Sequence, residues 1–498
     1  MISDLPGVFS LLLSLFLLTY SIRSIVFLYI AKKTAEQKGL LLYDFWNITR
    51  KNNYYLDKCL SSEDIGRKYH TKNHLQRKNL LVTGPWKKEN KGINPVRYPF
   101  VSILIATYNE ALVIHRLMRS CMSLTYSQDS YEIIVVDDSQ DGTFYELKNI
   151  WTYRIPNLKV IHREKRTGWK GGALNLAVKN MNDSSSYALV VDADNVLVND
   201  ILEQFVLRFL SSDTNSNDYP WVVQGYPISY VNSDNHMLRN LTNASWIARA
   251  IDFRLTLRNL IENLAKNSLK LPVQITGSLF MIRADIIKKI GFSDDICEDW
   301  DLTLDLNFPP KNSLLQDHKA YTPDERNIRK IIFDPFLLSY SEAITKVRTY
   351  LKQRKRVSEG HTRGFRRRII LILNSNISIL NKIEFLFTGL QYLKFAVIFV
   401  LIVIDVIIFL TSVTSIEQII NGNQLIKLSL TMQSVNLLSA LATIFFAMPL
   451  CRSIRNYTVN DAFYLLLLNI WTLPVLVLGS LLAFVRTQGF FYKVERNK

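Results

Sequence analysis

Residues 187–194 read Tyr-Ala-Leu-Val-Val-Asp-Ala-Asp, an apolar run that ends in two carboxylates one residue apart. A strand that is apolar throughout is buried on both faces, which is typical of a parallel sheet. Ligands of such sheets bind at the carboxyl ends of the strands. Asp192 and Asp194 would therefore suit Mg²⁺ or Mn²⁺ carrying a diphosphate, although the same pattern also fits a turn or a helix N-cap.

Three more apolar runs, at 101–106, 132–136 and 158–162, predict neighbouring strands. They alternate with helix-like stretches over residues 98–340, which predicts an α/β domain with a mostly parallel sheet. Two of these strands and the acidic strand end in polar residues, which we expect to meet at one edge of the sheet. These polar ends contain Thr107, Glu110, Asp137, Asp138, Asp192 and Asp194.

Two of the polar segments indicate nucleotide chemistry. Asp137 and Asp138 can accept the imide N–H of a uracil ring, or they can cap a turn, because the residues after them favour turns. Lys170 lies in a glycine-rich helix start at 166–175, where backbone N–H groups and the ammonium suit phosphate oxygens. Glycine-rich helix starts are also common without a ligand, so a structural alternative stays open for both segments.

Two charged motifs follow in the second half of the chain. Glu298 and Asp299 open an expected helix, where a carboxylate can act as the general base for an attacking hydroxyl. The alternative is an acidic first turn that interacts favourably with the helix dipole. The basic helix with Gln353, Arg354 and Arg356 would contact lipid, or in a nucleotide-sugar enzyme its arginines would stabilise a leaving diphosphate.

Apolar stretches at both ends of the chain predict at least four membrane-spanning helices, at 5–30, 395–410, 428–450 and 462–485. Lysines after the first stretch place the middle of the chain in the cytoplasm and the N-terminus outside. A cytoplasmic basic tail then requires a fifth membrane-embedded element, which we place between residues 368 and 390.

The net charge of +17 is concentrated next to the predicted spans, which favours contacts with anionic lipid headgroups over nucleic acid. Four widely spaced cysteines lack metal-ligand spacing and fit a reducing compartment. The expected organisation is a transmembrane helix (1–30), a basic cytoplasmic linker (31–97), the α/β domain (98–340), the basic helix with interfacial amphipathic helices (341–394), C-terminal transmembrane helices (395–485) and a basic tail (486–498).

In order and spacing, these motifs resemble those of the family 2 glycosyltransferases, in particular the membrane-embedded branch of cellulose, mannan and hyaluronan synthases. The resemblance is strong over about residues 98–360 and implies a GT-A-type nucleotide-sugar-binding fold. It implies Asp299, next to Glu298, as the catalytic base and Asp194 as the ligand of Mg²⁺ or Mn²⁺. The residues that it assigns to the substrate are Thr107, Glu110, Asp137, Asp138, Lys170, Asp192, Gln353, Arg354 and Arg356.

The chain departs from the family pattern in two motifs. Cys297 stands where the threonine of the Thr-Glu-Asp motif is expected, and Val357 replaces the tryptophan of the Gln-x-x-Arg-Trp motif. Because that tryptophan helps to form the acceptor platform in the family, Val357 puts the acceptor and processivity in doubt. Trp300 would offer another aromatic surface to the substrate, unless it packs beneath its own helix.

The resemblance implies a metal-dependent inverting hexosyltransferase in the plasma membrane with a cytoplasmic catalytic domain. It would move a sugar from a nucleotide-sugar donor, expected to be UDP-linked, to a growing β-linked polysaccharide, with or without secreting it. An alternative in the same class adds one sugar to a lipid acceptor. A remote alternative is a nucleotide-sensing membrane transporter or receptor.

Overall fold

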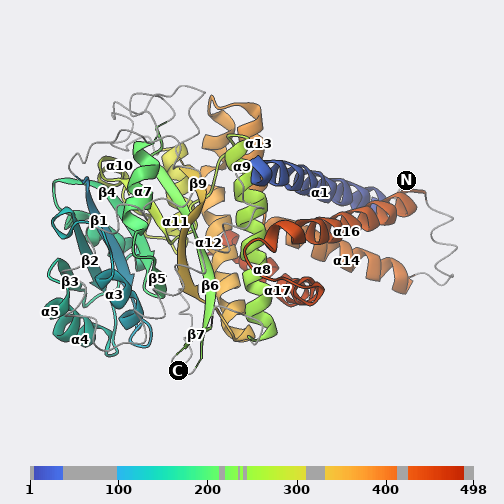
Figure 1. Ribbon diagram of the computed structural model, residues 1–498. Coiled ribbons are helices and arrows are strands. Elements are labelled where there is room, and N and C mark those ends of the chain that lie inside the picture. Colours follow the sequence, from blue (N-terminus) through green and yellow to red (C-terminus); the bar gives the residue numbers. More distant parts are fainter. Residues whose placement is uncertain are drawn as a thin grey trace.

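The computed structural model of the protein describes residues 5–37, 98–211, 219–233, 236–238, 244–309, 331–411 and 424–486. Most of the expected basic linker and nearly all of the basic tail lie outside these residues. An α/β domain occupies one side of the molecule, and long apolar helices project from its other side (Figure 1).

Nine strands of the described chain form one sheet, in the order β3-β2-β1-β4-β8-β6-β9-β5, with β7 paired to β6. The strands are β1 (Phe100–Thr107), β2 (Tyr131–Asp137), β3 (Leu158–His162), β4 (Ser185–Asp192), β5 (Asn195–Leu197), β6 (Val222–Ser233), β7 (His236–Leu238), β8 (Phe280–Arg283) and β9 (Ile331–Glu342).

The half of the sheet built from β3, β2, β1 and β4 is parallel throughout. Each of these strands contains one of the apolar runs expected from the sequence, so the predicted parallel α/β sheet is confirmed. The other half is mixed, because β8 runs antiparallel to both β4 and β6. β5 pairs antiparallel with β9, and this pairing brings Asn195, next to Asp194, opposite Ser341.

The helices of the α/β domain and its C-terminal extension are interspersed with short 3₁₀ and π segments. They are α3 (Ile114–Met122), η4 (Gln128–Ser130), α4 (Thr143–Glu146), η5 (Leu147–Trp151), α5 (Thr152–Arg154), α6 (Trp169–Lys179), α7 (Ile201–Leu210), α8 (Trp246–Leu257), η7 (Arg258–Asn263), α9 (Leu264–Ser268), α10 (Ala284–Ile290), α11 (Glu298–Asn307), α12 (Val347–Asn374) and α13 (Ile379–Gly389).

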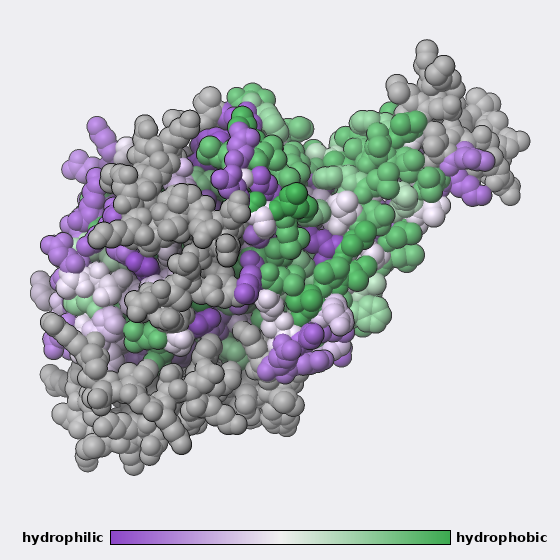
Figure 2. All heavy atoms as spheres, turned by 90° about the horizontal axis from the view of Figure 1, so that it is seen from above, coloured by the Kyte–Doolittle hydropathy of each residue, from purple (hydrophilic) through white to green (hydrophobic). Residues whose placement is uncertain are grey.

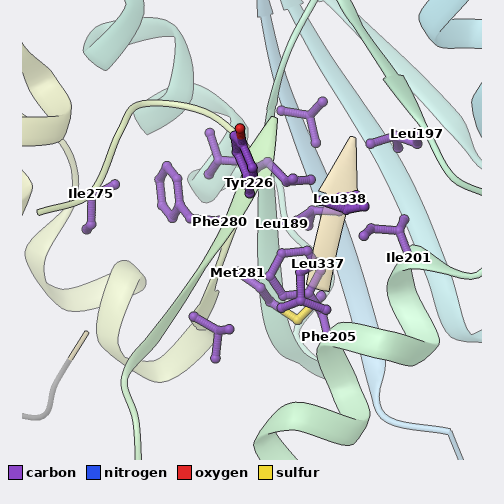
Figure 3. Packing of buried hydrophobic residues seen from close by; sticks show 14 of the residues in the cluster. Leu189, Leu197, Ile201, Phe205, Tyr226, Ile275, Phe280, Met281, Leu337 and Leu338 are labelled. Atoms are coloured by element: carbon purple, nitrogen blue, oxygen red, sulfur yellow. The ribbon is translucent and has the colours of Figure 1, made fainter. Parts of the chain in front are cut away.

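The core of the domain lies between the sheet and α7 (Figure 3). Ile201 and Phe205 of α7 are fully buried, and Leu189 of β4 and Met281 of β8 are buried in the same cluster. Burial of these side chains on the sheet holds β4 in place. The strand end that carries Asp192 is therefore anchored by apolar packing.

The apolar helices are α1 (Leu5–Gln37), α14 (Leu393–Thr411), α16 (Gln424–Cys451) and α17 (Val459–Val485). Three helices of the described chain are long and apolar enough to span a membrane, over Gly7–Gln37, Ile426–Cys451 and Val459–Val485. Hydrophobic residues cover much of the arm that projects from the α/β domain (Figure 2).

A fourth span would combine α13 and α14, which meet at a bend of 62°. The expected fifth element at 368–390 falls on the end of α12 and on α13. In the structure α13 and α14 form a bent pair, which fits either a broken span or a re-entrant loop, so the fifth element stays a prediction. Ser378 begins α13, because its side chain accepts a hydrogen bond from the Asn381 N–H.

α12 lies between the α/β domain and α17, and glycines allow both of its contacts to be close. A Cβ on Gly360 would stand 2.7 Å from Cys297 Sγ on the α11 side. A Cβ on Gly479 of α17 would stand 2.6 Å from the carbonyl oxygen of Lys355 in α12. Since only glycine lacks a Cβ, these two positions let one helix contact the α/β domain and an apolar helix together.

Buried ion pairs also join α8 to the membrane helices. The Arg249 guanidinium donates to both Asp461 oxygens at 2.6 and 2.7 Å, and Asp461 in turn caps the start of α17. Arg455, which precedes α17, donates to Asp252 of α8 at 2.8 Å. Bidentate, charge-assisted contacts of this kind fix the orientation of the partners as well as holding them together.

We expect the Gly479→Ala variant to be less stable by about 1–3 kcal/mol, because the added methyl group forces α17 away from the Lys355 carbonyl in α12. Thermal unfolding in detergent measures the change. Gly142→Ala is the matched control, since a Cβ there meets nothing within 4 Å. Equal melting temperatures of the two variants would contradict close packing of α12 on α17.

Candidate active site

Asp137 is an organiser of the site. Its carboxylate is fully buried at the end of β2. It accepts hydrogen bonds from the hydroxyls of Thr107 at 2.6 Å and Ser139 at 2.5 Å, and it lies 2.9 Å from His162 Nδ1. Through these partners Asp137 holds the ends of β1, β2 and β3 together, and its contact with a substrate stays a prediction. The backbone N–H of Glu110 donates to Thr143 Oγ1 at 2.9 Å, which ties the loop after β1 to the same edge.

Asp138 is held by an arginine that sequence reasoning missed. Arg163 donates from Nε and Nη2 to the two carboxylate oxygens of Asp138 at 2.6 and 2.5 Å. Arg166 lies 3.7 Å from the same carboxylate, and its guanidinium carbon stands 3.6 Å from the centre of the Tyr108 ring. Both arginines follow β3, whereas polar residues were predicted to form the site only at the ends of the other three strands. The polar residues after β3 were the sequence feature that could have indicated these arginines.

Lys170 connects three separate segments. Its ammonium donates to Asp192 Oδ1 at 2.6 Å and to the carbonyl of Gly277 at 2.7 Å, and it lies 3.1 Å from Glu298 Oε1. Burial lowers the pKa of Lys170, but the carboxylates of Asp192 and Glu298 outweigh it and raise the pKa above its usual value. Lys170 is therefore a stable cation at the edge where β4 ends.

The glycines around Lys170 also have a packing role. A Cβ on Gly171 would overlap the carbonyl oxygen of Ser293 and stand 3.4 Å from Glu298 Cβ. The start of α6 can therefore lie directly against the segment that leads into α11. This close approach accounts for Gly171 without a ligand, and it also brings Lys170 to Glu298.

Asp194 is buried, whereas Asp192 keeps 40% of its side chain exposed. The Ser341 hydroxyl donates to Asp194 Oδ2 at 3.3 Å. In the described ranges no cluster of three His, Cys, Asp or Glu residues could hold a metal by itself. Mg²⁺ is commonly bound by one or two carboxylates, with substrate phosphates and water completing the shell. Asp192 and Asp194 fit such a site, with the diphosphate supplying further oxygens.

Asp299 lies against the backbone of Gly277, the same residue that binds Lys170. Gly277 has φ of +80°, and a Cβ on it would stand 3.2 Å from Asp299 Oδ2. Asp299 Oδ1 accepts the N–H of Trp300 at 2.8 Å. Enclosure by the protein and the neighbouring Glu298 carboxylate raise the pKa of Asp299 to about 6, while Lys170 and this N–H act in the opposite direction. A carboxylate with this pKa is a stronger base than usual and is still ionised at neutral pH.

α12 brings its arginines to the same place. Arg354 and Arg356 lie within electrostatic reach of Asp299, and Gln353 is on the same helix turn. The Cys297 thiol points to the carbonyl of Val357 at 3.7 Å. The two positions that depart from the family pattern are therefore in contact with each other.

Trp300 is buried and does not offer an aromatic surface to a substrate. Only 1% of its surface is exposed, and its ring stacks on His361 at 4.3 Å between ring centres. The alternative in which Trp300 packs beneath its helix is the one observed. α11 begins at Glu298, so the side chains of Asp299 and Trp300 leave the helix in different directions.

Comparison with known proteins identifies the domain that carries these residues. Residues 102–291 match the family model described as glycosyl transferase family 2. The chain contains a family 2 glycosyltransferase domain. The match includes Asp138, Lys170 and both acidic residues of the Asp-x-Asp segment, whereas Asp299 and α12 lie beyond it.

This glycosyltransferase domain has named relatives with different acceptors. A beta-monoglucosyldiacylglycerol synthase of Trichormus variabilis is 37% identical over 126 residues, which cover 25% of each chain. A probable glucomannan 4-beta-mannosyltransferase of Arabidopsis thaliana is 34% identical over 102 residues, 20% of this chain and 18% of that protein. The matched segments thus span a quarter or less of these relatives.

Among solved structures, the mannosyltransferase PcManGT from Pyrobaculum calidifontis, in complex with GDP-Man and Mn²⁺, is 17% identical with a TM-score of 0.48. The comparison covers 84% of this chain and 97% of that one.

Turnover by the glycosyltransferase domain should fall as the pH is lowered through about 6, because Asp299 acts as a base only when deprotonated. Lys170→Gln removes a cation that lowers the pKa of Asp299, so the midpoint of this fall should move to higher pH. Nucleotide release measured against pH tests both statements. Lys179→Gln, an exposed lysine at the end of the same helix, should leave the midpoint unchanged; an unchanged midpoint in Lys170→Gln would count against the assignment.

Proposed function

We propose that the protein is a membrane-bound inverting glycosyltransferase that transfers a hexose from a nucleotide-sugar to an acceptor held at the membrane. The observation that carries the proposal is the meeting of Lys170 and Asp299 at Gly277. Its carbonyl accepts from Lys170, its Cα faces Asp299, and Lys170 also binds Asp192. A cation for the diphosphate and a base for the acceptor thus flank one backbone position.

Asp299 takes the proton of the acceptor hydroxyl, whose oxygen then bonds to the anomeric carbon of the donor. The bond between that carbon and the diphosphate oxygen breaks, and the nucleoside diphosphate leaves with the electron pair. One displacement from the opposite face inverts the anomeric configuration, so an α-linked donor gives a β-linked product. Lys170, Arg354 and Arg356 stabilise the negative charge of the leaving group.

Asp194, with Asp192 beside it, would hold Mg²⁺ or Mn²⁺, which neutralises diphosphate charge when bound. We assign the nucleobase of the donor to a position beside Asp138, and we retain UDP as the expected nucleotide. A nucleobase bound there would share the Asp138 carboxylate with Arg163, which donates to both of its oxygens.

Two acceptors are considered. The resemblance to the synthase branch and the mannosyltransferase relative support a growing β-linked polysaccharide. Addition of a single sugar to a lipid is supported by Val357 in place of the tryptophan, by the buried Trp300 and by the glycolipid synthase relative. In either case, Lys32, Lys33 and Lys38 after the first apolar stretch support a cytoplasmic catalytic domain.

The Asp299→Asn variant should bind the nucleotide-sugar with unchanged affinity but lose transfer by about a hundredfold or more, because the amide cannot accept the hydroxyl proton. Calorimetric donor binding and release of nucleoside diphosphate measure the two properties. Asp183→Asn, at a fully exposed carboxylate, is the control and should behave as the wild type. Wild-type turnover in Asp299→Asn would remove Asp299 from the mechanism. A transporter or receptor would bind the nucleotide without releasing it from the sugar.

Metal dependence has its own test. A chelator should stop nucleotide release, and Mg²⁺ or Mn²⁺ should restore it. Asp194→Asn should weaken Mn²⁺ binding in the presence of nucleoside diphosphate, which can be followed by paramagnetic resonance of the ion. Full activity in excess chelator would contradict a metal at Asp194.

A further inference from the structure

Four basic side chains between Asp299 and the membrane helices have no carboxylate within 4 Å in the described part of the chain. They are Arg254 of α8, Arg258 of η7, Arg354 of α12 and Lys394 of α14. Each is partly accessible. We call this set the cationic belt. Glu262 acts on Lys394 and Arg258 from a greater distance, but it is already paired with Arg23 at 2.8 Å and with Lys266 at 3.0 Å.

The belt is continuous because its members share neighbours. Arg254 Nη1 donates to Tyr350 Oη at 2.5 Å, and the Arg354 guanidinium carbon lies 5.4 Å from the centre of the same ring. Arg258 and Arg354 are within electrostatic reach of Asp299. Lys394 is within electrostatic reach of Arg254.

The far end of the belt is at the membrane helices. Lys394 is the second residue of α14, and its ammonium lies 4.9 Å from the centre of the Tyr20 ring in α1. The belt therefore leads from the catalytic base to a contact between two apolar helices. An acceptor that approached Asp299 from the bilayer would pass along the belt.

Neighbouring cations that are partly withdrawn from water repel one another and lose hydration. Other arginines at this interface have a carboxylate partner, as Arg455 has in Asp252. On α8 itself, Arg249 is paired with Asp461, five residues before Arg254, which donates to the Tyr350 hydroxyl. The contrast on one helix indicates that the counter-charge of the belt comes from a bound molecule.

The donor diphosphate does not account for the whole belt. The cations proposed for it are Lys170, which binds Asp192 at the end of β4, and Arg354 and Arg356 of α12, so Arg354 is the belt residue shared with it. Arg254 contacts Tyr350, and Lys394 contacts Tyr20 of the apolar helix α1. A second anionic group, on the acceptor, would meet them there.

Building on the proposed function, we infer that the acceptor is a lipid that carries a phosphate between its hydrocarbon and the hydroxyl to be glycosylated. The cationic belt binds the phosphate and presents the hydroxyl to Asp299. The reaction is the displacement described above: the hydroxyl proton goes to Asp299, the acceptor oxygen bonds to the anomeric carbon, and the donor diphosphate leaves. The lipid phosphate keeps its charge and its bonds.

The product itself tests the inference. Membranes that contain the full chain are incubated with labelled nucleotide-sugar, and the labelled lipid is analysed by mass spectrometry. A labelled glycolipid that contains phosphate supports the inference. A neutral glycosyl-diacylglycerol, or a polysaccharide without lipid, overturns it. Failure of the proposed function is distinct, because no donor would then release nucleotide.

Binding is tested with phosphatidylglycerol as the probe, in nanodiscs made otherwise of phosphatidylcholine. Phosphatidylglycerol should raise the melting temperature of the wild type. In Arg254→Gln and in Lys394→Gln, the phosphatidylglycerol content needed for half of this rise should increase about fivefold or more. The rise should persist in Lys159→Gln, which removes one exposed charge of β3.

Three further results show whether the negative charge at the belt comes from a lipid phosphate or from a soluble phosphate. In phosphatidylcholine alone, both belt variants should melt no lower than the wild type, because they remove a repulsive cation. Donor affinity should also be unchanged in both. Equal stabilisation of wild type and variants by phosphatidylglycerol, or displacement of the lipid effect by nucleoside diphosphate or inorganic phosphate, would overturn an acceptor site at the belt.

Discussion

The contact on which the site depends is made by the Lys170 ammonium. It joins Asp192 at the end of β4, the Gly277 carbonyl before β8 and Glu298 at the start of α11, and these partners together span residues 192–298 of the chain. Because Glu298 precedes Asp299, the position of the base is set by the same cation that faces the donor. Lys170 also opposes the rise in the pKa of Asp299, so this one cation affects both the position and the protonation of Asp299.

Close packing transmits this geometry to the membrane helices. Gly360 lets α12 contact Cys297 just before the base, and Gly479 lets α17 contact α12 on the other side. A side chain larger than hydrogen at either position would separate the layers. The paired Arg249 and Asp461 hold the same two parts together by charge. Asp299, the proposed base, is thus rigidly connected to the helices that would hold a membrane acceptor.

Structure that depends on residues near one another in the chain was predicted more reliably than contacts between distant segments. The apolar runs of β1 to β4 have short-range patterns, so the parallel half of the sheet was predicted from the sequence. The pairing of the antiparallel β8 with β4 and that of β5 with β9 join residues 90 or more positions apart and were not predicted. Arg163 is only 25 residues from Asp138, but its role depends on which strand lies beside β2: the pairing of β3 with β2 brings Arg163 to Asp138. For Trp300, burial against His361 was one of two alternatives, and only the packing of α12 decides between them.

The sequence by itself determined the composition of the site: an acidic strand end, a lysine at a glycine-rich helix start, an acidic helix start and a basic helix, between apolar segments long enough to span a membrane. These features are local, and their chemistry is legible without coordinates. The tertiary structure decided which charges are neutralised. Asp137 accepts hydrogen bonds from Thr107 and Ser139, Asp138 pairs with Arg163 and Arg249 pairs with Asp461. Within the described residues, Arg254 and Lys394 have no carboxylate within 4 Å; their contacts include Tyr350 and Tyr20. The attraction between two opposite charges decreases steeply with distance when salt screens it. Which charges pair therefore depends on how distant segments pack, and it cannot be inferred from spacing along the chain.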